Sequence, residues 1–467
     1  MQNTQIWEAV QTLQSKEYKE LERLLDSPFF NRKEPPARLF QYLKNCLETR
    51  QTPEASAAFR ATFPAETPYN DAKMRLANSD LLALLERYWV LQGWSEDTIR
   101  YKTALAAAYR KRNLTKHAGI ALREARQARA AAPCRDADYF ETGYALELED
   151  YQQASAARRY EAFNLQEISD LLDSAYLARK LRLVCLALSH QAVYKTAYQF
   201  GPLEALLEFV AEAPQLQTPA VGLYFHACRF LSDPSAESDF EAFRQLLGTA
   251  SGLFSVEERR ALYLMAINFG IKKCNEGGAL VWYEATFRLY QSALEMGLML
   301  ENGILSRFAY NNIAAFAMRL GETAWAERFI TEYKPFLERK YRESAFSMNS
   351  ARVAYARRDY GAALLHLQKA DYRDFINAMN ARTLQMKIYY ETDEYDLLES
   401  HLDSMQHYIR RHRAAGYHRD NYLNVVRHLR ALLRCNLNDP EAVRALRAGI
   451  AGEDVLSERV WLLEQLR

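Results

Sequence analysis

The sequence predicts an all-α fold, an α-solenoid of stacked antiparallel helix pairs. Glycine (17) and proline (13) are scarce in a chain of 467 residues. Since both residue types interrupt helices, their scarcity favours mostly helical structure with short connections. Three short polar turns also recur late in the chain, and the residues that follow them, Ala326, Ala363 and Leu398, stand 37 and 35 residues apart. A period of ~34 residues is typical of stacked helix-turn-helix units.

Apolar stripes at helical spacing predict the helices of the first 132 residues. Ile6, Val10 and Leu13 share one helix face, and Ser15 separates them from a second stripe that begins at Tyr18. A proline at position 28 ends this pair, because the residue before a proline avoids helical geometry. The helices expected next lie around 39–47, across 76–91, and along an Ala/Arg-rich stretch at 95–132.

Repeat-like turns continue through the middle of the chain at irregular spacing, near Ala154, Ala205 and Ala242. Gly277-Gly278 is expected to form the turn of a further unit. We therefore expect four regions along the chain. They are an N-terminal helical region (1–132), irregular helical repeats (133–298), regular repeats (299–413), and a final repeat with capping helices (414–467).

Two family resemblances support this organisation. With Ile313-Ala314 and Leu320-Gly321 at one turn, and small residues where paired helices would touch, the stretch 300–413 resembles tetratricopeptide repeats. That resemblance implies a right-handed superhelix. The whole chain also resembles an uncharacterised family of long bacterial helical-repeat proteins, in segments such as Ser27-Pro28-Phe29-Phe30-Asn31 and Asn421-Tyr422-Leu423-Asn424. The second resemblance adds support for the fold and implies no function.

Composition argues against several classes of protein. The net charge is +1, with 60 basic and 59 acidic residues, so the whole chain has no electrostatic drive toward nucleic acid or an anionic membrane. No stretch approaches ~18 consecutive apolar residues, and the first residues lack the basic-then-apolar pattern of a signal peptide. The six scattered cysteines are expected to be reduced and buried. We expect a cytoplasmic protein.

The tetratricopeptide resemblance also suggests where a partner would bind. Grooves of that family that bind peptide carboxylates use Asn amides and Lys or Arg side chains on the first helix of each unit. The comparable residues here are Asn311, Asn312 and Arg319, then Asn349 and Arg352, then Asn380 and Lys387. Amides can bond an extended backbone and cations can pair with acidic side chains. We expect a protein-interaction scaffold for a peptide or helix, with partner identity and oligomeric state left open.

Two basic stretches, 100–129 and 410–434, support an alternative function. In the second stretch tyrosines alternate with arginines that could bind phosphates while the rings stack on bases. The arginines of this alternative basic face are Arg410, Arg411, Arg413, Arg419 and Arg427. A nucleic-acid-binding helical-repeat protein is therefore the second hypothesis, against charge segregation that serves solubility or an acidic protein partner.

Catalytic and metal-binding patterns are not found in the sequence. It has no nucleophile elbow, phosphate-binding loop, HExxH motif or dinucleotide fingerprint, so no catalytic residue, cofactor or enzymatic activity is expected. Five histidines, His401, His407, His412, His418 and His428, lie close together in sequence. Their spacings of 6, 5, 6 and 10 residues scatter the rings around a helix, so no metal site is expected.

Overall fold

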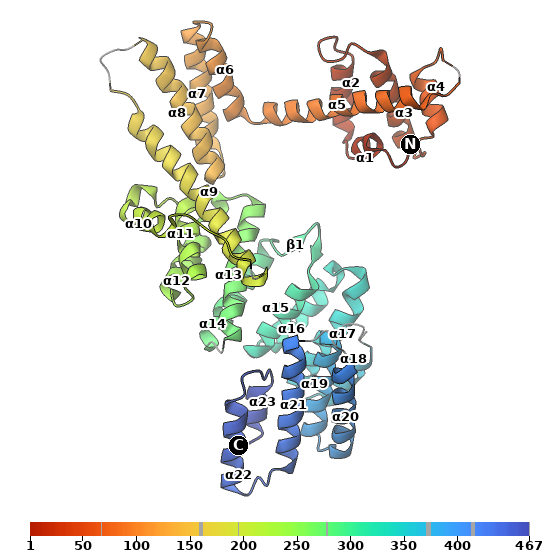
Figure 1. Cartoon of the computed structure of the whole chain (residues 1–467), viewed down its shortest axis with the longest axis vertical. Helices are drawn as coiled ribbons and strands as arrows, with labels where there is room; N and C mark the ends of the chain where they lie inside the picture. Colours follow the sequence, from red (N-terminus) through yellow and green to blue (C-terminus); the bar gives the residue numbers. More distant parts are fainter. Residues whose placement is uncertain are drawn as a thin grey trace. The chain divides into compact units, whose positions relative to one another are not determined.

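The computed structural model describes residues 1–66, 68–157, 162–194, 196–276, 279–369, 375–411 and 416–466 (Figure 1). Over these residues the chain forms twenty-three α-helices, three 3₁₀ turns and one pair of two-residue strands. The predicted all-α class is confirmed. The turn expected at Gly277-Gly278 lies outside the described residues.

Contacts divide the chain into two compact units, unit 1 (Met1–Asp233) and unit 2 (Pro234–Arg467). The predicted regional boundaries after residues 132 and 298 lie inside these units. Unit 1 contains α1 (Gln5–Gln11), α2 (Ser15–Leu25), α3 (Glu34–Glu48), α4 (Ala55–Thr62), α5 (Asp71–Glu96), α6 (Thr98–Arg110), α7 (Thr115–Ala131), α8 (Ala137–Ala157), α9 (Leu165–Tyr194), α10 (Leu203–Glu212), η1 (Pro214–Leu216) and α11 (Pro219–Ser232).

The first five helices enclose one apolar core. The predicted stripe residues Ile6 and Val10 of α1 are buried in it together with Leu81 and Leu85 of α5. Thr4 caps α1, because its side chain accepts a hydrogen bond from the backbone N–H of Trp7. The helix pair predicted across Ser15 is therefore present, and α5 packs on α1, α2 and α3.

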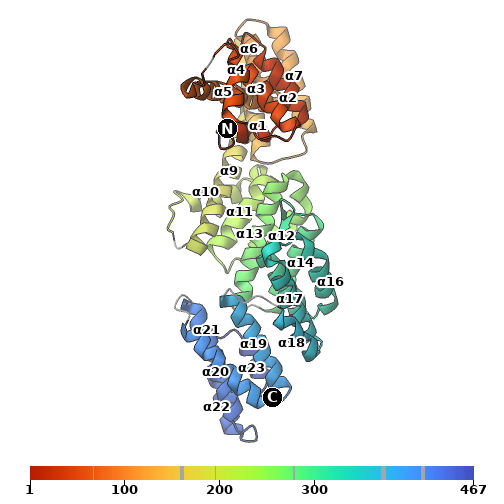
Figure 2. The same cartoon turned by 90° about the vertical axis from the view of Figure 1, so that its right-hand side faces the viewer.

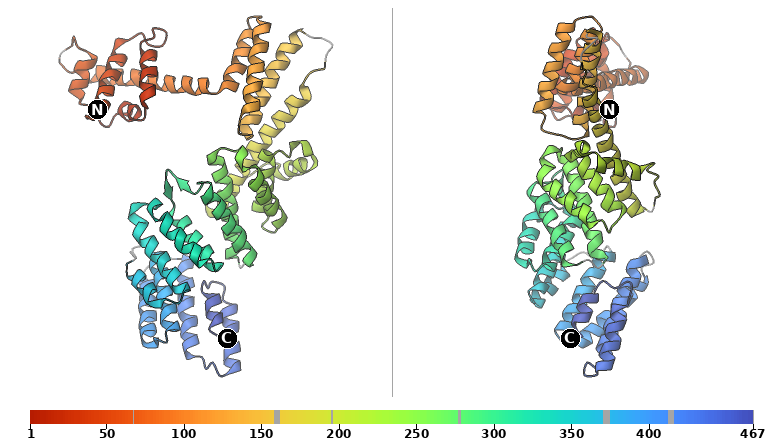
Figure 3. Two further views of the ribbon diagram at one scale, coloured as in Figure 1. Left: turned by 180° about the vertical axis from the view of Figure 1, so that it is seen from behind. Right: turned by 90° about the vertical axis from the view of Figure 1, so that its left-hand side faces the viewer.

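The Ala/Arg-rich stretch is helical, as its composition predicted, and forms the two helices α6 and α7. The chain turns at Asn113, whose φ of +60° places it in the left-handed region, and Leu114 N–H donates to the Tyr109 carbonyl. Asparagine tolerates this conformation better than most residues, which explains the break. The resulting α6 and α7 lie side by side with α8 (Figure 3), and small side chains such as Ala106 and Ala121 permit the close approach.

Unit 2 consists of helices that each contact the next. It contains α12 (Glu237–Ala250), η2 (Ser251–Leu253), α13 (Val256–Asn275), α14 (Leu280–Glu295), β1 (Leu300–Glu301), β2 (Ile304–Leu305), α15 (Arg307–Arg319), α16 (Thr323–Tyr333), η3 (Lys334–Phe336), α17 (Arg339–Ala356), α18 (Tyr360–Gln368), α19 (Phe375–Glu391), α20 (Tyr395–Arg411), α21 (Gly416–Arg434), α22 (Pro440–Ala451) and α23 (Arg459–Glu464). In addition, α15 contacts α17, and α17 contacts α19.

The three predicted turns of unit 2 share one backbone geometry. Gly321, Arg358 and Asp393 all have positive φ, at +79°, +60° and +59°. In each turn the next N–H donates to the carbonyl five residues back, as in the bond from Glu322 to Ala317 at 2.9 Å. This is the Schellman ending of a helix, which glycine adopts most readily. A repeated backbone motif therefore underlies the 37- and 35-residue steps, although only one turn uses glycine.

The residues used to align these turns are the ones that the helices bury. Ala326, Ala363 and Leu398 each have 0% exposure, and they lie on α16, α18 and α20. Figure 2 shows α19, α20 and α21 side by side in the last part of unit 2, where α19 contacts α20 and α20 contacts α21. The periodicity of the sequence therefore marks equivalent positions in the core.

One short hairpin departs from the predicted helical pattern. Leu300–Glu301 pairs antiparallel with Ile304–Leu305, and the two residues between them, Asn302 and Gly303, have φ of +51° and +76°. Asn-Gly is a strong hairpin signal, because both residues tolerate left-handed geometry. The signal was present in the sequence, but strands this short show no alternation.

Candidate functional site

The predicted binding residues of α15 and α17 meet at a buried amide pair. Asn349 has 0% exposure, and its Nδ2 donates to Asn311 Oδ1 at 2.7 Å and to the Ala345 carbonyl at 2.9 Å. Asn349 was expected to line a binding surface, but the structure buries it completely. Its amide therefore joins two helices and has no surface for a ligand to contact.

Arg352 and Lys387 occupy equivalent positions on α17 and α19. They stand 35 residues apart, the same step that separates Ala363 from Leu398. Lys387 Nζ lies 3.1 Å from Glu458 Oε2, and both side chains are mostly buried. Burial lowers the pKa of the half-buried Arg352 guanidinium, and the negative field of Glu458 opposes that shift. Two predicted residues therefore face one carboxylate just before α23.

A second carboxylate, Glu391 at the end of α19, gathers three aromatic donors. Tyr360 Oη donates to Glu391 Oε2 at 2.6 Å, Trp461 Nε1 donates to Glu391 Oε1 at 2.7 Å, and Tyr355 Oη donates to the same Oε1. Burial and the bond to Glu391 raise the pKa of Tyr360 to about 12. Trp461 also meets Tyr390 edge-on, with ring centroids 5.4 Å apart.

The helix α21 holds the non-helical residues that precede α23. Asn421 Oδ1 accepts from Ser457 N–H at 2.7 Å, and Asn421 Nδ2 donates to Ser457 Oγ at 3.0 Å. One turn along α21, Asn424 Nδ2 donates to the Val455 carbonyl at 3.0 Å. Asparagine amides therefore bind an irregular backbone through both a donor and an acceptor.

An acidic side chain of the same segment is also bound by α21. Glu453 Oε2 lies 2.9 Å from His428 Nε2 and pairs with Arg427, while Asn424 Nδ2 donates to Glu453 Oε1 at 3.0 Å. The bond to His428 lowers the pKa of Glu453, burial opposes it, and the charge of Arg427 adds to the lowering. We call the side chains of α19 and α21 that contact residues 453–461, together with Arg352 of α17, the candidate face.

Sequence reasoning found only part of this face. It named Arg352 and Lys387, and it quoted Asn421 and Asn424 for a resemblance without a role. The spacing of three residues between these asparagines places both on one side of a helix, which was the available signal. The acidic and aromatic residues before and in α23 gave no local signal, because their partners lie up to 71 residues away.

The other predicted residues are more dispersed. Asn312 is half-buried and bonds the Tyr290 hydroxyl, whereas Asn380 accepts from Tyr422 Oη at 3.0 Å. Arg319 is exposed at the end of α15, with its guanidinium 5.7 Å from the Tyr283 ring centroid. These three residues do not contact the 453–461 segment in the described structure.

The basic stretches are paired in part with acidic residues of the same chain. In the first, Arg110 lies 2.6 Å from Glu149, and Arg126 contacts Glu147 at 2.7 Å and Asp150 at 2.8 Å. In the second, Arg427 pairs with Glu453, and Arg430 pairs with Asp403. Arg410, Arg411 and Arg419 are exposed, and Arg413 lies outside the described residues.

No metal-binding cluster is found in the part of the chain that the structure describes. There, no group of three His, Cys, Asp or Glu side chains is placed to hold a metal ion. His401 bonds the Arg382 carbonyl at 2.8 Å, and burial lowers its pKa. His407 bonds the Asp403 carbonyl, and His412 lies outside the described residues. The rings of His401 and His407 therefore bond backbone carbonyls and do not converge on one point.

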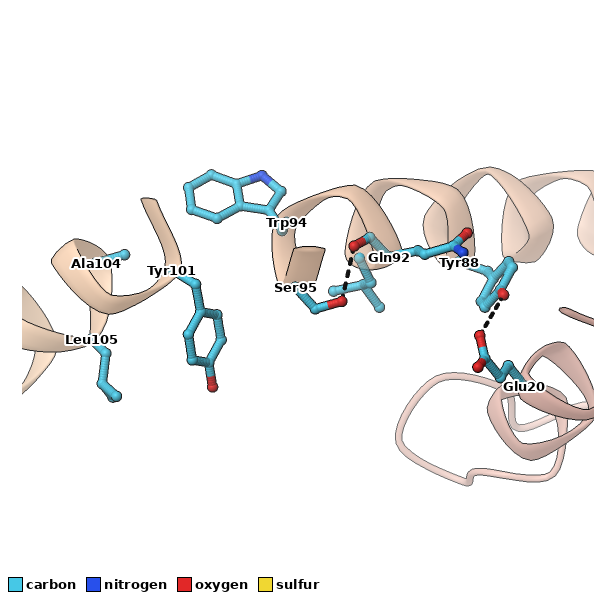
Figure 4. Close-up of a pocket in the computed structure, with 9 residues that line it drawn as sticks. Glu20, Tyr88, Gln92, Trp94, Ser95, Tyr101, Ala104 and Leu105 are labelled. Atoms are coloured by element: carbon cyan, nitrogen blue, oxygen red, sulfur yellow. Dashed lines mark hydrogen bonds between the residues drawn. The ribbon is translucent and has the colours of Figure 1, made fainter. Parts of the chain in front are cut away.

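A hollow of about 660 Å³ that was not predicted lies beside α5 in unit 1 (Figure 4). Tyr88 Oη donates to Glu20 Oε2 there at 2.8 Å, and Ser95 Oγ donates to the Gln92 carbonyl. Burial and Glu20 raise the pKa of Tyr88. Trp94 is half exposed at the rim. The lining is mostly apolar, and Tyr88 and Glu20 form a hydrogen-bonded polar pair in it.

Comparisons with known proteins add no homology to these observations. The chain matches no family model, no curated protein and no solved structure. Among the described helices, none has both the length and the apolar character that spanning a bilayer requires.

Proposed function

We propose that this chain is a non-catalytic interaction scaffold that binds a peptide segment of another protein along the candidate face. In this proposal the helices form a tetratricopeptide-like α-solenoid of antiparallel pairs with a right-handed superhelix. The contacts of α15 with α17 and of α17 with α19, together with the three equivalent turns, support that arrangement.

One observation carries the proposal: the candidate face already holds a non-helical segment by its backbone. Asn421 accepts from Ser457 N–H, and Asn424 donates to the Val455 carbonyl. Backbone bonding of this kind does not depend on side-chain identity, so it suits a surface that accommodates a foreign peptide. Nearby apolar and aromatic contacts would supply affinity, as in other peptide-binding surfaces.

Charge favours an acidic peptide. Arg352 has no carboxylate within ion-pairing distance among the described residues, and its guanidinium donates to Asn349 Oδ1 at 3.4 Å. Lys387 stands at the equivalent position of the next repeat. A partner carboxylate near Arg352 would therefore gain a charge-assisted bond. The pairing of the basic stretches makes a nucleic-acid partner less favourable than an acidic protein.

Affinity capture tests the proposal directly. The immobilised chain and its Arg352→Glu/Lys387→Glu variant would be compared for the proteins that they retain from an extract of the source cell. We expect specific partners to be lost from the variant. The matched control reverses two exposed charges, Arg328→Glu/Arg339→Glu, and should retain them. If both variants retain every partner, the candidate face is not the binding site.

A further inference from the structure

The stretch between α22 and α23 connects two helices without being helical itself. Residues 453–458 form no regular structure, and α23 then begins at Arg459. Figure 1 shows α23 beside α21, and the two helices are in contact. The segment is therefore bound mainly by side chains of other helices.

Its contacts lie at three anchor points. Glu453 binds Arg427 and His428 at one end. Glu458 binds Lys387, and Trp461 donates to Glu391 at the other end. The anchors follow the pattern Glu-x4-Glu-x2-Trp. The backbone bonds of Asn421 and Asn424 lie between them, so the segment has the backbone and charged contacts set out for a partner peptide, apart from an ion pair with Arg352.

The polar anchors are accessible at their edges. The side chains of Glu453 and Glu458 keep 20% and 25% of their exposure, whereas Leu462 and Leu466 farther along are almost completely buried. Partly exposed ion pairs are individually weak and exchange readily with solvent and competing ions. Within the segment only Leu456 and Trp461 are buried, with 8% and 7% exposure. Displacement of residues 453–461 therefore breaks weak ion pairs and frees these two side chains, while Leu462 and Leu466 keep the end of the chain in the core.

We propose that residues 453–461 are an internal ligand that closes the candidate face, and that the partner is an acidic segment with the same Glu-x4-Glu-x2-Trp chemistry. The partner binds by displacing the internal segment, which sets a threshold for binding. This inference rests on the proposed function, because it assigns the partner class and the regulation of the same face.

A labelled peptide with the sequence of residues 452–466 tests this inference. Its affinity would be measured by fluorescence anisotropy for the full chain and for Glu453→Gln/Glu458→Gln, which weakens the internal ligand and leaves the candidate face intact. We expect the variant to bind the peptide at least about tenfold more tightly than the unmodified chain. A peptide with glutamine at both glutamate positions should lose a similar factor.

The matched control removes the same amount of charge from the same region. Asp454→Asn/Glu464→Gln alters two exposed carboxylates that form no ion pair or hydrogen bond with other described residues, and it should bind the peptide no better than the unmodified chain. If the labelled peptide binds the unmodified chain and both variants with equal affinity, the inference is overturned. A dimer of the Glu453→Gln/Glu458→Gln variant that the free peptide does not dissociate would also overturn it.

Hydrogen exchange of the unmodified chain gives a second readout that needs no variant. The Ser457 amide should exchange through a local opening that leaves α21 protected, so its exchange should not depend on denaturant at low concentration. Exchange of Ser457 and α21 together, only through global unfolding, would overturn the inference. If the labelled peptide binds neither the unmodified chain nor the Glu453→Gln/Glu458→Gln variant, residues 453–461 are not an internal ligand. If captured partners still require Arg352 and Lys387 in that case, the scaffold function stands.

Discussion

Asn349 is a polar side chain in the core of unit 2, where its amide nitrogen donates two hydrogen bonds. Its Nδ2 donates to Asn311 Oδ1 and to the Ala345 carbonyl. We expect Asn349→Ala to lower the free energy of unfolding by about 1–3 kcal/mol, because Asn311 and a buried backbone acceptor lose their donor. Urea denaturation measures the loss. Arg319→Ala, an exposed change, should remain within about 0.5 kcal/mol of the unmodified chain. Equal losses in both variants would contradict the structural role of the amide.

The lowered pKa of Glu453 predicts how the stability of the fold depends on pH. Its pKa lies below the ordinary value of 4.5, chiefly because of the bond to His428 and the charge of Arg427. The carboxylate therefore contributes stability that is complete above pH 4.5 and is lost as the pH falls through the lower folded-state pKa. We expect the difference in Tm between the unmodified chain and Glu453→Gln to be constant near neutrality and to shrink below that point. A difference unchanged down to pH ~3 would contradict this contribution.

At the scale of helices, Gly270 sets the approach of α13 to α14. A Cβ at this position would lie 2.1 Å from Thr286 Oγ1, which is buried and donates to the Trp282 carbonyl. We expect Gly270→Ala to destabilise unit 2 by about 1–3 kcal/mol through overpacking. Gly248 on α12 is exposed, and a Cβ there would meet nothing within 4 Å.

The control for that change is Gly248→Ala. It should stabilise the protein by up to about 1 kcal/mol, because alanine favours helix more than glycine does. Thermal unfolding of both variants measures the two effects. Opposite signs support the close contact between α13 and α14, and stabilisation by both variants would contradict it.

Two cysteines link α9 with α11 without forming a disulfide. Cys185 Sγ and Cys228 Sγ lie 3.4 Å apart in the core, and burial raises the pKa of Cys185. We expect diamide to oxidise this pair slowly, because reaction requires the thiolate and entry into the core. The two thiols would lose two hydrogens to the diamide as the disulfide forms. Mass spectrometry of peptides should detect the cross-link, and Cys228→Ser should abolish it. A cross-link absent even after prolonged oxidation in mild urea would contradict the pairing.

The sequence predicted local features of the helices better than their distant contacts. The three Schellman turns were predictable because the signals of each lie within a few residues of Gly321, Arg358 or Asp393. The break at Asn113 was missed, because one left-handed residue competes with the strong helix propensity of the alanines around it. The bond between Asn421 and Ser457 could not be predicted, since it depends on how the chain folds back over 36 residues.

At the scale of the whole molecule, local charge is balanced within the fold. The chain has a net charge of +1, yet its basic stretches read as strongly positive in sequence. Acidic residues of α8 and of the segment before α23 pair with them across helices. The ion pair of Arg427 with Glu453, which holds the 453–461 segment, therefore also reduces the positive charge on the surface. This distribution of charge favours acidic peptides and disfavours long polyanions.

Nucleic-acid binding gives the test of that balance. Binding to polyanions depends on releasing counterions from many phosphates, and a cation already paired with a carboxylate contributes little. We therefore expect no binding to random single-stranded RNA or duplex DNA at ~10 μM protein in ~100 mM salt. Electrophoretic mobility shift over a salt series measures it. Micromolar binding that weakens steeply with salt would favour the alternative function. Its loss in Arg410→Glu/Arg411→Glu would assign that binding to the exposed arginines of α20, which have no ion pair among the described residues.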